Sequence, residues 1–168
     1  MMIITVAFQP AAYSQQNSLG TSWSFSGVGL TYERTVTEDA FAHIDIKMEM
    51  AETFLGKATH PGLSTAFTWN LVFAGFESRN GTPVRFFAGP GFTAGLSHDM
   101  SAPPGLFFGL KGRVGMKCIY DRKINISVSL SPVLGIYMTE KNENILTRIY
   151  RHGLLQAILP EIGLSYRF

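Results

Sequence analysis

The chain has 168 residues, a mass of 18.5 kDa and a formal net charge of +2. This is the length of one domain, and the charge is too small to indicate a nucleic-acid-binding protein. Hydrophobic residues make up 46% of the chain and charged residues 15%, whereas about a quarter of residues are charged in a typical soluble domain. The composition therefore favours a membrane protein or a heavily buried one. No apolar run reaches the roughly 18 residues of a membrane-spanning helix, so any crossing of a bilayer would be made by strands.

Residues 1–14 allow two interpretations. The segment is largely apolar and ends in Ala12-Tyr13-Ser14, a small-x-small pattern typical of a signal-peptide cleavage site, although it lacks the usual basic start. Alternation of Ile4, Val6 and Phe8 with Thr5, Ala7 and Gln9 instead predicts a strand. We expect residues 1–14 to be the remnant of a signal peptide, with a first strand as the alternative, and residues 15–168 to form one domain.

The clearest strand pattern lies in Ala42–Met50. Its even-numbered residues are apolar and its odd-numbered residues are ionisable, reading Ala-His-Ile-Asp-Ile-Lys-Met-Glu-Met. Side chains alternate between the two faces of a strand, so one face would be apolar and the other ionic. Similar alternation predicts further strands over about Thr21–Arg34, Leu63–Phe76, Val84–Leu96, Leu106–Tyr120 and Ile124–Met138.

The connections between these strands differ in length. Short turns are expected at 35–39, 77–83 and 121–123, and longer connections at 53–61, 97–105 and 139–153. Pro90, Pro132 and Pro160 fall within apparent strands, which implies local bulges or strand ends because proline removes a ladder hydrogen bond.

The last strand, about Leu159–Phe168, places Ile162, Leu164, Tyr166 and Phe168 on one face. A closing strand of alternating apolar residues that ends in phenylalanine resembles the last strand of bacterial outer-membrane β-barrels. The chain is similar to the small OmpX/OmpW-like class of these proteins. The resemblance implies an all-β fold, an antiparallel up-and-down transmembrane β-barrel of about eight strands, in the outer membrane of a Gram-negative envelope.

The resemblance also implies partners. Outer-membrane lipid would contact the apolar face, and the barrel-assembly machinery would recognise the C-terminal strand, with Tyr166 and Phe168 as the assembly signal. The protein would be a monomer, and nucleic acid is not expected.

The origin of the eighth strand stays open in the sequence. If short turns are periplasmic, as in such barrels, the strand at Thr21–Arg34 runs downward and needs an earlier upward strand, which residues 2–14 would supply. If residues 1–14 are a cleaved signal, the eighth strand comes instead from about Ile145–Arg151, and the short turns face outward.

The predicted inward faces collect charges of both signs, which we expect to fill the lumen with ion pairs. An eight-stranded barrel has room only for side chains in its interior, and buried charges must be paired, so this network needs no catalytic role. Asp45 and Glu49 are expected to neutralise basic residues such as Lys111 and Arg113. The lumen charge network comprises Glu33, His43, Asp45, Lys47, Glu49, Arg85, Lys111, Arg113, Lys117, Glu161 and Arg167.

No catalytic, metal or cofactor site is expected. The four histidines lack the spacing of a zinc motif, and Ser97-His98-Asp99 places three triad residue types side by side, where they rarely converge on one reacting atom. The single cysteine, Cys118, has the parity of an apolar filler facing lipid. We therefore expect a non-enzymatic porin-like barrel with a structural or surface-interaction role.

Three alternatives remain. One is an outer-membrane lipid-modifying enzyme, which would need a histidine and a serine facing each other at the outer rim. Another is a narrow channel for small hydrophobic molecules. The third is a soluble lipocalin-like barrel, which would turn the phenylalanine, leucine and isoleucine faces inward and the charged faces into water.

Overall fold

The computed structural model describes residues 17–50, 60–78, 81–97, 104–141, 144–155 and 158–168. The segment predicted to be a signal peptide or a first strand, residues 1–14, lies outside them. The described part of the chain contains ten strands and one short helix, α2 (Arg151–Leu155). The strands are β1 (Asn17–Ser24), β2 (Gly27–Thr37), β3 (Ala40–Glu49), β4 (Gly62–Glu77), β5 (Pro83–Ser97), β6 (Gly105–Tyr120), β7 (Ile124–Leu130), β8 (Val133–Lys141), β9 (Asn144–Ile149) and β10 (Glu161–Arg167).

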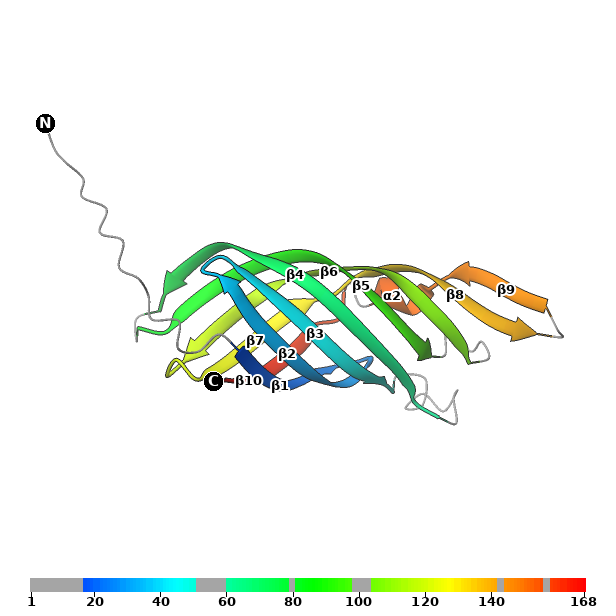
Figure 1. The fold of residues 1–168 in the computed structure, drawn as a ribbon, viewed down its shortest axis with the longest axis horizontal. Helices are drawn as coiled ribbons and strands as arrows, with labels where there is room; N and C mark the ends of the chain where they lie inside the picture. Colours follow the sequence, from blue (N-terminus) through cyan, green and yellow to red (C-terminus); the bar gives the residue numbers. More distant parts are fainter. Residues whose placement is uncertain (1–16, 51–59, 79–80, 98–103, 142–143, 156–157) are drawn as a thin grey trace, which may run out of the picture.

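The strands form a closed antiparallel barrel with eight positions around its wall (Figure 1). Strands β1 to β6 follow one another around the wall, and β10 pairs with both β7 and β1. Because β1 and β10 close the sheet on itself, the barrel has no free edge along this seam. The predicted all-β, up-and-down barrel of about eight strands is confirmed.

Two wall positions are each shared by two strands. Strand β6 pairs with β7 through Val114 and Leu130 and with β8 through Lys111 and Val133. The register is the same on both sides of Pro132, so β7 and β8 act as one interrupted strand. Strand β9 pairs with β8, and β10 pairs with β7, so β9, α2 and β10 make up the next wall position. In Figure 1, β8 and β9 extend beyond the other strands.

The prolines interrupt the sheet where the sequence indicated. Pro132 separates β7 from β8, and Pro160 precedes β10. Pro90 lies inside β5, where pairing to β6 is continuous but pairing to β4 is missing between Ala88 and Gly91. Proline has no N–H to donate, which accounts for a gap on one side of the strand only.

The predicted strand at Thr21–Arg34 is wrong, because it is two strands. Strands β1 and β2 are joined at Phe25 and Ser26, and the hairpin is tight at Gly27. A Cβ atom at Gly27 would lie 1.9 Å from the backbone oxygen of Met48, so no larger residue fits there without movement. This hairpin supplies the earlier strand that the turn pattern required. Strand β9 also exists near Ile145–Arg151, but it shares its wall position with β10.

The ends of the barrel differ in their connections. Asn17 and Phe168 lie together at one end, which we call the terminal end, and are joined by two backbone hydrogen bonds of 2.9 and 3.3 Å. The β2–β3, β4–β5 and β6–β7 turns also lie there. In the β6–β7 turn Lys123 N donates to Tyr120 O, and the two residues between them, Asp121 and Arg122, have positive φ, as a type I′ turn requires. The opposite end, which we call the loop end, carries the β1–β2 turn, the last residues of β3, β5 and β8 and the first residues of β4, β6 and β9.

The inner and outer faces of the wall have opposite chemistry. Ile44, Ile46 and Met48 of β3 are exposed on the outside, whereas His43, Asp45 and Lys47 are buried inside. The same division holds on β6, where Leu110 is exposed and Lys111 is buried. The lipocalin-like arrangement, with the apolar faces inward and the charged faces outward, is therefore wrong for this fold. In the part of the chain described, no helix has the length and apolar character needed to span a bilayer.

Candidate functional site

The barrel interior is the candidate functional site, because it holds most of the buried charged side chains. Strands β2, β3, β6 and β10 supply them, and each faces inward by the alternation of its own strand. The structure brings together eight of the residues predicted to form the lumen network. They are Glu33, His43, Asp45, Lys47, Lys111, Arg113, Lys117 and Glu161.

Glu33 on β2 is the most connected carboxylate of this network. Its Oε2 atom accepts a hydrogen bond from Lys117 Nζ at 2.5 Å and one from Ser18 Oγ at 3.5 Å. Its Oε1 atom lies 3.1 Å from His43 Nδ1 and 3.5 Å from Arg113 Nη1. One carboxylate thus pairs with one lysine and one arginine. Buried charges are stable only when they are paired and hydrogen-bonded in this way.

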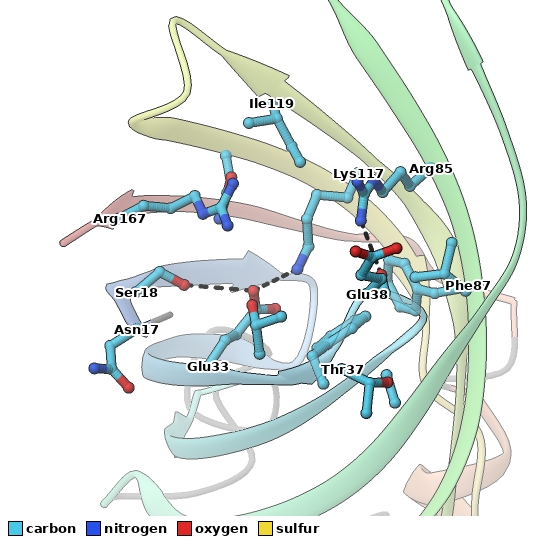
Figure 2. Close-up of a pocket in the computed structure, with 15 residues that line it drawn as sticks. Asn17, Ser18, Glu33, Thr37, Glu38, Arg85, Phe87, Lys117, Ile119 and Arg167 are labelled. Carbon is cyan, nitrogen blue, oxygen red and sulfur yellow. Dashed lines mark hydrogen bonds and ion pairs between the residues drawn. The ribbon is translucent and has the colours of Figure 1, made fainter. Parts of the chain in front are cut away.

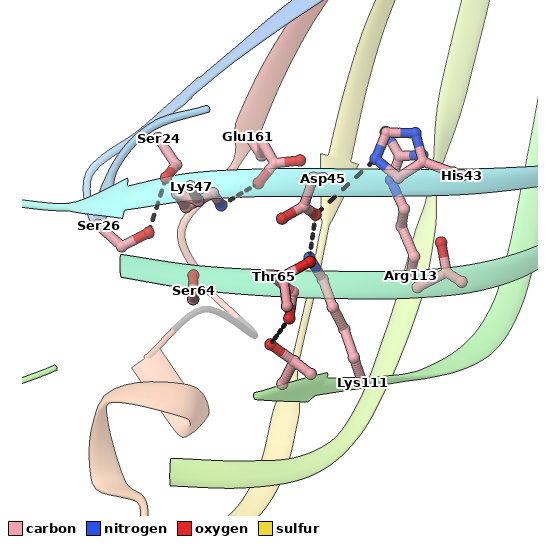
Figure 3. Close-up of polar contacts among 12 residues, drawn as sticks. Ser24, Ser26, His43, Asp45, Lys47, Ser64, Thr65, Lys111, Arg113 and Glu161 are labelled. Carbon is pink, nitrogen blue, oxygen red and sulfur yellow. Dashed lines mark hydrogen bonds and ion pairs between the residues drawn. The ribbon is translucent and has the colours of Figure 1, made fainter. Parts of the chain in front are cut away.

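A second group of ion pairs lies nearer the loop end (Figure 3). Lys111 Nζ donates to Asp45 Oδ2 at 2.6 Å, and Lys47 pairs with Glu161 across the lumen. His43 Nε2 is 3.9 Å from Asp45 Oδ2, which links the two groups. These side chains come from strands on different sides of the barrel, so the pairs bridge the interior rather than follow one strand.

Three predicted members of the network take other positions. Glu49 accepts a hydrogen bond from Ser64 Oγ at 2.8 Å, so the partner described for it is a hydroxyl rather than the expected cation. Arg85 is exposed at the terminal end and donates to the backbone oxygen of Glu38 at 3.1 Å. Arg167 is half-buried beside the same opening.

Aromatic side chains pack inside the barrel near the loop end. Phe107 and Tyr150 stack with ring centroids 4.3 Å apart, and Tyr137 lies 6.3 Å from Tyr150. With Val133 these residues form a buried cluster, which we call the aromatic cluster. It lies where α2 interrupts the last wall position, so side-chain packing replaces strand pairing there. Strand alternation predicts that Phe107 faces inward, whereas Tyr150 follows β9 and no alternation in the sequence assigned it to the interior.

A cavity of about 70 Å³ opens at the terminal end, and we call it the terminal cavity (Figure 2). Phe41 and Phe87 are buried on its apolar side, in an edge-to-face contact with centroids 5.2 Å apart. Lys117 Nζ lies 3.8 Å from the centre of the Phe41 ring. Ser18 and Asn125 also line the cavity, and neither was singled out in the sequence as a functional residue.

The side chains of two of the four histidines are described. His43, the histidine inside the lumen, contacts carboxylates, and His60 is exposed. His98 and Asp99 lie outside the described residues. Within the described ranges no group of three or more His, Cys, Asp and Glu side chains could hold a metal ion.

Comparisons with known proteins add no family. The chain matches no protein-family model, and neither the curated proteins nor the solved structures give a significant match. The fold and the side chains themselves therefore carry the functional argument. They define the class of the protein as a closed antiparallel β-barrel with an apolar outer face and an ionic interior.

Proposed function

We propose that the chain is an integral outer-membrane β-barrel protein with a structural or surface-interaction role and a charged, largely plugged lumen. Its membrane partner is the outer-membrane lipid around it, and it acts as a monomer. The observation that carries this proposal is the outer face, where each of the ten described strands exposes at least one large apolar side chain, Phe92 on β5 and Leu134 on β8 included.

The outer face is too apolar for a protein surrounded by water. Leu110 is 70% exposed, Phe73 66% and Leu134 64%, and they belong to a belt that runs around the barrel. Soluble monomers rarely expose apolar patches larger than a few hundred Å². An aromatic row of Tyr32, Tyr120 and Tyr166 near the terminal end also suits a membrane interface, because tyrosine is stable with its ring in lipid and its hydroxyl in water.

The interior supports a plug rather than a passage. The ion pairs of Glu33, Asp45 and Glu161 bridge the lumen, and the aromatic cluster packs inside the barrel near the loop end. A channel for small hydrophobic molecules would need a continuous apolar path, which the charged side chains oppose. A lipid-modifying enzyme would need a histidine and serine pair at the outer rim, and no described contact favours one.

The C-terminal strand suits the proposed assembly signal. Tyr166 and Phe168 are 52% and 55% exposed on the outer face, while β10 pairs with β1 and β7. Recognition of these side chains by the barrel-assembly machinery would couple insertion to the strand that closes the barrel.

The test is membrane fractionation of the full chain expressed in a Gram-negative host, combined with gel mobility of boiled and unboiled samples. A folded outer-membrane barrel is expected in the outer-membrane fraction, resistant to alkaline extraction, and with different mobility before and after boiling. Refolding of purified chain into lipid vesicles gives the second measurement. A chain that stays in the aqueous fraction as a folded monomer, and that does not insert into vesicles, would overturn the proposal.

A further inference from the structure

We propose that the terminal cavity binds a small oxyanion that keeps one O–H group, the chemistry of a phosphate that is free or that ends a lipid as a monoester. Three cationic side chains from three strands meet at this cavity: Arg85 from β5, Lys117 from β6 and Arg167 from β10. Figure 2 shows Arg85 and Lys117 beside each other and Arg167 across the opening from them. Arg85 and Lys117 are register partners in the β5–β6 hairpin, and Arg167 reaches the same opening because β10 pairs with β7, the next strand along the wall.

The charge around the cavity favours an anion. Its lining holds these three cations and two carboxylates, Glu33 and Glu38. Glu33 is shared with a fourth cation, Arg113, which lies behind the cavity wall. Glu38 is exposed in the β2–β3 turn. The local balance is therefore positive, and a cleft lined by one sign of charge concentrates ions of the other sign.

The size and walls of the cavity suit a compact ligand. A water molecule needs about 10–15 Å³ of such space, so the cavity of about 70 Å³ has room for one tetrahedral oxyanion or a few waters. Phe41 and Phe87 are only 5% and 0% exposed on one side of it. Apolar walls lower the local dielectric constant and strengthen charge-assisted hydrogen bonds from guanidinium groups.

Asn125 indicates that the ligand also donates a hydrogen bond. This residue lines the cavity and is 4% exposed, and its Oδ1 atom has no hydrogen-bond partner within the described structure. Its Nδ2 atom donates to Ser165 Oγ at 3.3 Å, and in this amide orientation Oδ1 is the remaining acceptor. Buried acceptors are normally satisfied. Hydrogen phosphate offers both charged oxygens and one O–H, whereas sulfate is fully deprotonated at neutral pH.

The experiment is calorimetric titration of the full chain folded in an uncharged, phosphate-free maltoside detergent. Inorganic phosphate, sulfate and a short-chain phosphatidate are titrated separately. The assay does not require membrane insertion, so its failure is distinct from failure of the proposed outer-membrane location. Unboiled gel mobility of each sample verifies that the barrel is folded.

We expect saturable binding of one phosphate group per chain, with sulfate weaker. Arg85→Gln and Arg167→Gln should each weaken binding about tenfold, because each removes a charge-assisted hydrogen bond. Arg34→Gln is the matched control, since Arg34 is near the same end but exposed on the outer side of β2. It should leave binding unchanged.

The titrations with inorganic phosphate and with phosphatidate distinguish a free phosphate from a lipid headgroup. Binding of inorganic phosphate with no competition from phosphatidate identifies free phosphate, and preferential binding of phosphatidate identifies a lipid headgroup. No saturable binding of either ligand would overturn the site, as would equal losses in Arg34→Gln and Arg167→Gln. Sulfate binding as tight as phosphate would overturn the assignment to an oxyanion with an O–H group.

Discussion

The outward side chains of β3 lie on open surface, whereas each ionisable side chain on its inner face has a described partner. Ile46 is 52% exposed with nothing packed over it, while Asp45 and Lys47, its two neighbours, are paired with residues on β6 and β10. An outward position therefore requires only an apolar side chain. An inward position requires a side chain of a particular charge at a particular level along the barrel axis. The same alternating pattern encodes a permissive face and a specific one.

The largest expected effect on the free energy of unfolding is at Glu33, the inward carboxylate with the most partners. Glu33→Gln should lower the free energy of unfolding by about 3–5 kcal/mol, because it leaves the buried Lys117 and Arg113 without their carboxylate. Urea unfolding of the chain folded in detergent measures this. Glu38→Gln, exposed in the nearby turn, serves as control and should change little. Equal stability of the two variants would contradict a specific interior.

Ile46→Arg tests whether the outer face contacts lipid, because its effect on stability should depend on what surrounds the barrel. In lipid vesicles the variant should be destabilised by about 2–4 kcal/mol, because the guanidinium would face hydrocarbon. In detergent micelles, which deform around a charge, the loss should be smaller. Ile46→Leu should match the parent in both. An Ile46→Arg barrel that folds equally well in vesicles would mean that this face does not contact lipid.

The aromatic cluster is expected to be less sensitive than the ion pairs. Tyr150→Leu should cost about 1–2 kcal/mol, since the leucine still fills part of the space but loses the stacking on Phe107. Tyr166→Leu, a matched change on the outer face, should cost less in detergent. The two variants can be compared in the same urea unfolding series. If Tyr150→Leu lowered the free energy of unfolding as much as Glu33→Gln, side-chain packing rather than charge pairing would be the main source of stability in the interior.

The smallest effect is expected at a buried hydroxyl. Ser129 is 2% exposed, and its Oγ atom has no hydrogen-bond partner in the described structure. Ser129→Ala should therefore change the free energy of unfolding by less than about 0.5 kcal/mol or stabilise slightly. Ser64→Ala is the contrasting variant, because it removes the hydrogen bond to Glu49. A loss at Ser129 greater than at Ser64 would indicate a bridging water with an essential role.

Alternation alone was sufficient to predict the barrel class and the inward parity of its charges. The period of two decides which face a residue occupies, so His43, Asp45 and Lys47 could be assigned to the interior without knowing their partners. The partners themselves depend on how far each strand is shifted along its neighbour. Lys47 meets Glu161 on the other side of the lumen, and nothing local in either segment specifies that.

Local turn chemistry accounts for the main error in the strand boundaries. Phe25 and Ser26 interrupt the apolar alternation by only two residues, so Thr21–Arg34 looked continuous, although Ser24, Ser26 and Gly27 are common turn residues. The terminal cavity was also beyond sequence reasoning. Arg85 and Arg167 were assigned to the lumen, but the pairing of β10 with β7, which brings Arg167 to the same opening as Arg85 and Asn125, joins segments far apart in the sequence.

The hydrogen bonds between Asn17 and Phe168 have a consequence for folding. Most neighbouring strands in the wall are close in sequence and can form as local hairpins, but the β1–β10 seam joins the two ends of the described chain. The entropic cost of closing so long a loop falls on this one contact, so the seam is expected to form last and to limit the folding rate. It also makes the barrel a natural candidate for circular permutation, since a short linker could join the paired ends and new termini could open at a hairpin.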